Sequence, residues 1–185
     1  MAFSKIAFIV NPHAGNGSTE SNWSYIEAVA RDRLGHFETY MTQKPGDAVR
    51  FAEDAVAKDA GLLVCVGGDG TLNEVINGIM MHEESKRSSV ILGFVPNGTG
   101  CDFVKTLPIP QNIEHAIDAI AGGYVRAIDL GRLSHLFLLC GRRSYPFFYT
   151  ARNGYELESI MVLNRSLRSG TWPLQMASTM AAVCG

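Results

Sequence analysis

The chain of 185 residues lacks several features that would each define a class of protein. It has no CxxC pair, which argues against a zinc site of the usual spacing and against a disulfide framework. Its apolar runs, such as 62–66 and 136–140, are too short to span a bilayer, and the N-terminus has no signal-peptide pattern. We therefore expect a soluble protein of the reducing cytoplasm, whose four cysteines are Cys65, Cys101, Cys140 and Cys184.

Charged residues are also scarce, and the formal net charge is −2. No basic cluster is interleaved with aromatic residues, so we expect no nucleic-acid partner. The near balance hides an asymmetry, because residues 1–129 carry a net charge of −6 and residues 130–185 one of +4. The arginines of the second part suit peripheral contact with an anionic membrane, although scattered arginines also form ordinary solvated faces. They are Arg132, Arg142, Arg143, Arg152, Arg165 and Arg168.

Short apolar runs alternate with helical patterns along the first half of the chain. The spacing predicts strands at 5–11, 36–41, 62–66 and 90–95, and helices at 22–34, at 47–58 and after Gly70. Such βαβ alternation is typical of an α/β fold, in which helices cover a parallel sheet. Ligands of these sheets bind beyond the carboxyl ends of the strands. The length suits one hydrophobic core with part of a second domain.

The most informative segment is 66–74 (VGGDGTLNE), which places three glycines around one carboxylate between a strand and a helix. Glycine lets backbone N–H groups approach an anion, and the first turn of the helix adds unpaired donors. The Asp69 carboxylate would repel a phosphate, so we expect it beside a divalent cation or near a transferred phosphoryl group. Thr71 and Glu74 also fit a capping box, in which Thr71 caps the helix and Glu74 reaches back.

Polar or glycine-rich residues follow each of the four predicted strands. Because the carboxyl ends of parallel strands meet at one edge of the sheet, we expect the four loops to converge on one crevice. Each loop taken singly is also explained by ordinary turn chemistry. His13 is interpreted as a loop histidine, since it has no partner at metal-ligand spacing. The loops are 11–15, the segment at Thr42, 67–73 and 96–102.

Three motifs, in this order, resemble the catalytic domain of the diacylglycerol kinase family of lipid kinases, which includes the sphingosine and ceramide kinases. They are Asn11-Pro12-x-x-Gly15, Gly67 to Glu74, and Gly98-Thr99-Gly100-x-Asp102-Phe103. The GGDGT run alone is shared with NAD kinases and phosphofructokinase-like proteins. The resemblance implies a parallel-sheet nucleotide-binding domain at 1–129 and the incomplete start of a β-rich, lipid-binding domain at 130–185.

The resemblance also implies an activity, in which the γ-phosphoryl group of ATP is transferred to a lipid hydroxyl with Mg²⁺ as the cofactor. Diacylglycerol is the default lipid. Asp69 corresponds to the catalytic residue that organises Mg²⁺ through water, and Thr42 and Thr99 correspond to nucleotide contacts. The expected nucleotide-binding residues are Asn11, Thr42, Gly67, Gly68, Asp69, Gly70, Thr71, Leu72, Asn73, Gly98 and Thr99.

Two departures from the family pattern leave alternatives open. Cys101 stands where the family usually has Asn, and a thiol cannot replace an amide that both donates and accepts hydrogen bonds. We interpret Cys101 as a buried small residue rather than a reactive thiol. The family's general base lies in the part of the second domain that we expect to be missing, and Glu156 is interpreted as a solvated charge.

The main alternative to a kinase is thus a catalytically incomplete nucleotide-binding module. An exposed apolar edge of such a module would favour self-association. An NAD kinase-like enzyme is a further alternative, because it shares the GGDGT run. A dinucleotide oxidoreductase is disfavoured, since no GxGxxG follows the first strand.

Overall fold

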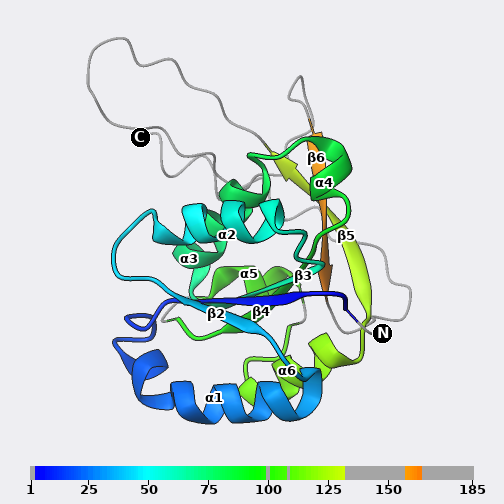
Figure 1. Cartoon of the computed structure of the whole chain (residues 1–185). Helices are drawn as coiled ribbons and strands as arrows, with labels where there is room; N and C mark the ends of the chain where they lie inside the picture. Colours follow the sequence, from blue (N-terminus) through cyan, green and yellow to red (C-terminus); the bar gives the residue numbers. More distant parts are fainter. Residues whose placement is uncertain (1–2, 99–100, 108, 132–156, 164–185) are drawn as a thin grey trace, which may run out of the picture.

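The computed structural model describes residues 3–98, 101–107, 109–131 and 157–163. Strands and helices alternate through most of this part, and the predicted α/β fold is confirmed (Figure 1). In chain order the elements are β1 (Ile6–Val10), α1 (Ser18–Leu34), β2 (Glu38–Met41), α2 (Asp47–Ala57), β3 (Leu62–Gly67), α3 (Asp69–Ile79), α4 (Glu84–Arg87), β4 (Ile91–Pro96), α5 (Asp102–Thr106), α6 (Ile113–Ala121), β5 (Val125–Gly131) and β6 (Leu157–Leu163).

A single sheet has the strand order β2-β1-β3-β4-β6-β5. The first four strands pair in parallel, as predicted, and β6 joins them parallel to β4 through Ile91–Met161 and Leu92–Val162. Strand β5 pairs antiparallel with β6 at the far edge. Every residue of β1 and β3 is buried, which explains why these strands are continuous apolar runs without alternation.

Helices cover both faces of the sheet, with α2 and α3 on one side and α1 and α6 on the other (Figure 1). Successive side chains of a strand point to opposite faces, so each central strand serves both cores. Ile9 and Leu63 pack on the side of α2 and α3. Phe8 and Val64 pack on the side of α1 and α6. The central strands β1 and β3 are therefore buried, whereas the edge strand β2 is partly exposed.

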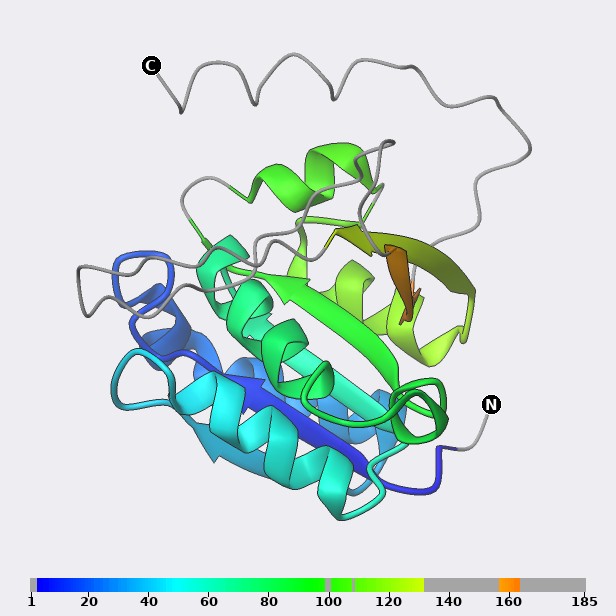
Figure 2. The same ribbon diagram turned by 90° about the horizontal axis from the view of Figure 1, so that it is seen from above.

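Helices α2 and α3 lie side by side (Figure 2), and Gly78 of α3 lies close to the backbone of α2. A Cβ atom added at Gly78 would lie 2.6 Å from the Cβ atom of Ala52, and it would also overlap the carbonyl oxygen of Val49. The small residues Gly78 and Ala52 therefore allow the two helix backbones to lie close together. This contact fixes the position of α3, whose first turn lies at the carboxyl end of β3.

Some predicted boundaries are wrong. Helix α1 begins at Ser18 rather than at residue 22, because Gly17 adopts the left-handed conformation (φ 85°) and turns the chain directly into the helix. Strand β2 is shorter than 36–41. Helix α3 begins at Asp69, before the glycine from which we expected it.

The division of the chain at residue 129 stays a prediction. Strand β5 crosses that position, and β6 belongs to the same sheet as β1 to β4. Glu156, the six arginines of 130–185, Cys140 and Cys184 lie outside the described residues. None of the helices that the structure describes combines the length and the apolar character needed to cross a bilayer.

Candidate functional site

The carboxyl ends of the first four strands enclose a groove of about 440 Å³. All four loops that the sequence predicted to converge contribute to its walls. The backbone hydrogen bonds between neighbouring strands continue one residue beyond the strand ends here. Thr42 N donates to Val10 O at 2.9 Å, and Asn97 N donates to Gly67 O at 2.8 Å. The groove is lined by Asn11, His13, Ala14, Gly15, Thr42, Gln43, Lys44, Pro45, Ala48, Gly68, Gly70, Thr71, Glu74 and Gly98.

The first turn of α3 opens into this groove. Gly68 is the N-cap in an extended conformation, and no side chain in the described part of the chain caps the helix. The backbone at Gly98 lies against the start of α3. The contact is so close that a Cβ atom added at Gly98 would come within 2.7 Å of the Gly68 Cα atom. Uncapped donors and the positive end of the helix dipole make such a turn suitable for an anion.

The capping box predicted for α3 is wrong. Thr71 lies inside the helix, where its Oγ1 accepts a hydrogen bond from Asn11 Nδ2 at 2.9 Å. Glu74 does not reach back along its own helix. Its Oε2 accepts the backbone N–H groups of Gly46 at 3.0 Å and of Ala48 at 3.3 Å, at the start of α2. Glu74 therefore caps the neighbouring helix and leaves the turn of α3 uncapped.

A second carboxylate, that of Asp47, holds the loop between β2 and α2. Its Oδ2 accepts the backbone N–H of Gln43 at 2.9 Å and of Lys44 at 3.1 Å, and its Oδ1 is paired with Arg50 at 3.2 Å. The hydrogen bond from Gln43 is the main cause that lowers the pKa of the Asp47 carboxyl group from its ordinary value. Asp47 is 5% exposed, so the loop is anchored from inside the protein.

Asn97 is a site residue that the sequence interpretation did not single out. Its Nδ2 donates to Thr19 Oγ1 at 2.8 Å, and Ser18 Oγ donates to its Oδ1 at 3.3 Å. Thr19 is fully buried and donates in turn to the carbonyl of Ala14. This network ties the loop after β4 to the first turn of α1. The available signal was an asparagine two residues beyond the predicted strand 90–95.

Asp69, the predicted catalytic residue, is the first residue of α3 and is half-buried. Its Oδ1 accepts the backbone N–H of Phe103 at 3.3 Å, which links α3 to α5. Among the described residues no cluster of three or more side chains could hold a metal ion. One carboxylate suits Mg²⁺ only where substrate phosphates complete the coordination, which is how this ion commonly binds in proteins.

The predicted nucleotide-binding residues differ in how they lie relative to the groove. Asn11, Thr42, Gly68, Gly70, Thr71 and Gly98 line the groove. Asp69 and Gly67 lie beside it, and Asn73 uses its carbonyl to accept a bond from Asn77 Nδ2 at 2.7 Å. The side chain of Leu72 is buried in the core, so only its backbone is available to a ligand. Thr99 lies outside the described residues.

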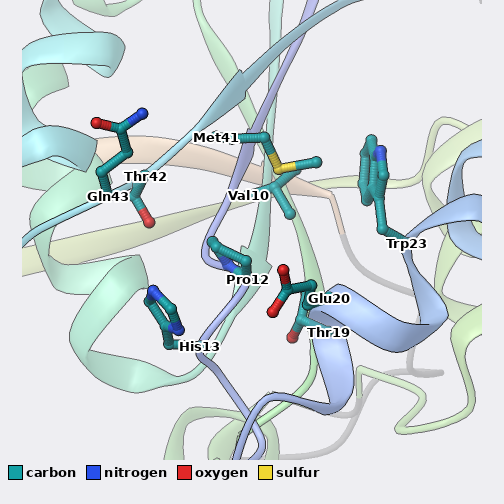
Figure 3. Close-up of a pocket in the computed structure, with 9 residues that line it drawn as sticks. All are labelled: Val10, Pro12, His13, Thr19, Glu20, Trp23, Met41, Thr42 and Gln43. Carbon is teal, nitrogen blue, oxygen red and sulfur yellow. The ribbon is translucent and has the colours of Figure 1, made fainter.

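A smaller pocket of about 360 Å³ adjoins the groove on the α1 side of the sheet (Figure 3). Val10, Trp23 and Met41 form its apolar walls, and Glu20 lies on the side of α1. His13 is shared by the pocket and the groove. It is an exposed loop residue, as predicted.

Cys101 is buried, as predicted, and precedes α5 in a left-handed conformation with φ 43° and ψ 53°. Its thiol donates to the carbonyl of Gly98 at 3.4 Å. Asparagine tolerates this backbone conformation better than most residues, which gives a physical reason for the Asn that the family usually has here. Burial raises the pKa of the nearby core thiol of Cys65, so that cysteine is not a reactive thiolate.

Replacing Cys101 with asparagine is expected to stabilise the protein by about 1 kcal/mol, because the side chain suits the left-handed backbone. The new amide can donate to the Gly98 carbonyl, as the thiol does now. Urea unfolding of the wild type and of Cys101→Asn measures the difference. Cys101→Ala serves as the control, since it keeps the backbone strain and removes the thiol. An asparagine variant less stable than the alanine variant would contradict the backbone explanation.

The fold and groove define an α/β protein with a mostly parallel sheet and a glycine-lined site at the carboxyl ends of its first four strands. Residues 5–133 match the family model described as "Diacylglycerol kinase catalytic domain". The chain belongs to this family.

Individual relatives agree with that assignment. A diacylglycerol kinase of Staphylococcus epidermidis is 42% identical over 115 residues, which are 61% of this chain and 35% of the relative. One of Staphylococcus aureus is 36% identical over 133 residues, 71% of this chain and 40% of the relative. A crystal structure of a diacylglycerol kinase from Bacillus anthracis superimposes with a TM-score of 0.63 at 32% identity, over 71% of this chain and 47% of that one. The chain thus spans less than half the length of these relatives.

Proposed function

We propose that the chain provides the nucleotide-binding part of an ATP-dependent lipid kinase, which transfers the γ-phosphoryl group to a lipid hydroxyl such as that of diacylglycerol. The observation that carries this proposal is the uncapped first turn of α3 inside a groove made by four loops. Family membership supports the reaction class and favours it over that of an NAD kinase.

The triphosphate is proposed to bind at α3 rather than at α2, although both helices start at the groove. The first turn of α2 already donates to the Glu74 carboxylate. Among the described side chains none caps the first turn of α3, and the space beside Gly70 is open, since a Cβ atom added there would meet nothing within 4 Å. Donors fixed in advance stabilise the charge of a transferring phosphoryl group without reorganisation.

In this proposal Asp69 holds Mg²⁺ through water, and the hydrogen bond from Phe103 orients its carboxylate. Bound Mg²⁺ supplies charge neutralisation for the phosphates. Asn11 and Thr42 position the nucleotide from the ends of β1 and β2. The wider assignments are also proposals: a cytoplasmic location, peripheral contact with an anionic membrane through the arginines of 130–185, and self-association.

A second candidate function is a nucleotide-binding module that does not catalyse transfer. Glu74 is the only carboxylate among the residues that line the groove in the described part of the chain. Its Oε2 already binds two N–H groups of α2, which holds the carboxylate in a structural role. Asp69, beside the groove, is assigned to Mg²⁺ in the first proposal, so no carboxylate at the described groove is then left to act as the general base for the lipid hydroxyl.

Asp69→Asn tests the proposal, because an amide oxygen can still accept from Phe103 while the charge that holds Mg²⁺ is lost. We expect the wild type to bind ATP more tightly with Mg²⁺, and the variant to lose about tenfold of that gain by calorimetry. Transfer of labelled phosphate to diacylglycerol micelles should fall with it. Asp59→Asn is the matched control, since Asp59 is exposed and pairs with Lys86.

The outcomes separate the two candidate functions. Mg²⁺-dependent ATP binding together with transfer supports the lipid kinase. Binding without transfer supports the nucleotide-binding module. A wild-type chain that binds no ATP contradicts both.

A further inference from the structure

The loop at 42–48 is held in one shape by carboxylates of the protein itself. Asp47 binds two of its backbone N–H groups and Glu74 binds two more. Pro45 has no N–H to offer. With Thr42 N bound to Val10 O and Asp47 N bound to Lys44 O, every backbone N–H group of this loop is engaged before any ligand arrives, so the loop must use side chains to donate to an anion in the groove.

Lys44 is the charged side chain that this loop presents. Among the residues that line the groove in the described chain, Lys44 is the only lysine or arginine. Its side chain is exposed, and it takes part in none of the ion pairs found among the described residues. The nearby Asp47 carboxylate is already satisfied by Arg50 and by backbone N–H groups. The charge of Lys44 helps to lower the pKa of the Asp47 carboxyl group, but the ammonium forms no ion pair with it and can bind a ligand.

A nucleotide carries more negative charge than the first turn of α3 can offset. The N-terminus of a helix offers the equivalent of about half a positive charge, which is far less than the charge of a triphosphate. Glu74 adds a negative charge to the same groove, although two N–H groups of α2 offset part of it. A protein cation beside the first turn of α3 would correct this imbalance, and a lysine ammonium is a common partner of phosphate.

We propose that Lys44 binds the phosphate chain of the nucleotide, as a cation that the rigid 42–48 loop holds beside the first turn of α3. This assignment rests on the proposed function, since it requires that the groove bind ATP. It adds to that function a side chain that recognises the anionic part of the nucleotide. The nucleoside part is left to other residues of the groove.

Calorimetric titrations with ATP, ADP and adenosine test the assignment in the wild type, Lys44→Ala and Lys44→Arg. We expect Lys44→Ala to weaken ATP binding about tenfold and to leave adenosine binding unchanged, because a charge-assisted contact to phosphate is lost. Lys44→Arg should recover most of the affinity for ATP. The dependence of ATP affinity on salt should also become shallower in Lys44→Ala.

Lys86→Ala is the matched control, since Lys86 is a partly exposed lysine in α4, which precedes β4 and so lies at the opposite end of the sheet. It should bind ATP as the wild type does. Thermal unfolding checks that each variant is folded, and the backbone hydrogen bonds of residue 44 do not depend on its side chain.

The possible results distinguish the two proposals. If the wild type binds ATP and Lys44→Ala binds it equally well, the Lys44 assignment is overturned and the proposed function stands. An equal loss for adenosine and ATP also overturns it, because the side chain would then contact the nucleoside. If the wild type fails to bind ATP, the proposed function fails and the assignment fails with it.

Discussion

Gly78→Ala is expected to destabilise the fold by about 3 kcal/mol, the upper end of the range for overpacking a protein interior. The added methyl group would lie 2.6 Å from the Ala52 Cβ atom and would overlap the Val49 carbonyl oxygen, so α2 and α3 must move apart. Backbone atoms cannot yield as a flexible side chain does. Thermal unfolding should show a midpoint roughly 10 °C lower.

Gly70→Ala provides the matched control, because it makes the same change in the same helix. A Cβ atom at Gly70 meets nothing within 4 Å, so this variant should be as stable as the wild type or slightly more stable. Equal stability of Gly78→Ala and Gly70→Ala would show that the two helices do not depend on a close contact at Gly78.

Gly98→Ala should weaken ATP binding on the order of a hundredfold, with little loss of stability. The new Cβ atom would lie 2.7 Å from the Gly68 Cα atom and 3.2 Å from the Cys101 thiol. The loop after β4 and the first turn of α3 would have to separate, and the proposed phosphate donors would move with them. Calorimetry with ATP and Mg²⁺ measures the loss.

Gly61→Ala is the control for this experiment. Gly61 lies just before β3, at the end of the sheet opposite the groove, and an added Cβ atom would come within 3.2 Å only of the flexible Ser4 hydroxyl. Its ATP affinity should match that of the wild type. If Gly98→Ala binds ATP normally, the groove does not use the donors at the start of α3, and the proposed position of the triphosphate is wrong.

The sequence predicted the central sheet well because burial on both faces leaves a clear signal. Strands such as 62–66 are continuous apolar runs bounded by turns, and the structure places them in the middle of the sheet. The convergence of the four loops followed from strand direction alone. The helix starts were harder to predict, because Gly17 begins α1 with a backbone conformation and not with a capping side chain.

Contacts between distant segments could not be predicted in the same way. Glu74 fitted a local capping box, yet it binds the start of α2, which lies 28 residues earlier in the chain at Gly46. Asn97 binds Thr19, which lies 78 residues earlier. A local motif is consistent with several partners, and the packing of α2 against α3 decides which of them is near. The position of the groove at the carboxyl ends of the strands was therefore predicted, but its internal hydrogen bonds were not, and the role of its residues in nucleotide binding stays a prediction.

The position of β6 in the sheet means that the sheet is completed late during synthesis of the chain. Strand β4 pairs with β3 on one side, and on its other side Ile91 and Leu92 pair with β6, which is more than sixty residues further along. Until those residues are made, β4 is an open sheet edge, a state in which proteins are prone to wrong pairing and aggregation. The segment that matches the family model, residues 5–133, ends before β6 and on its own would keep that edge open.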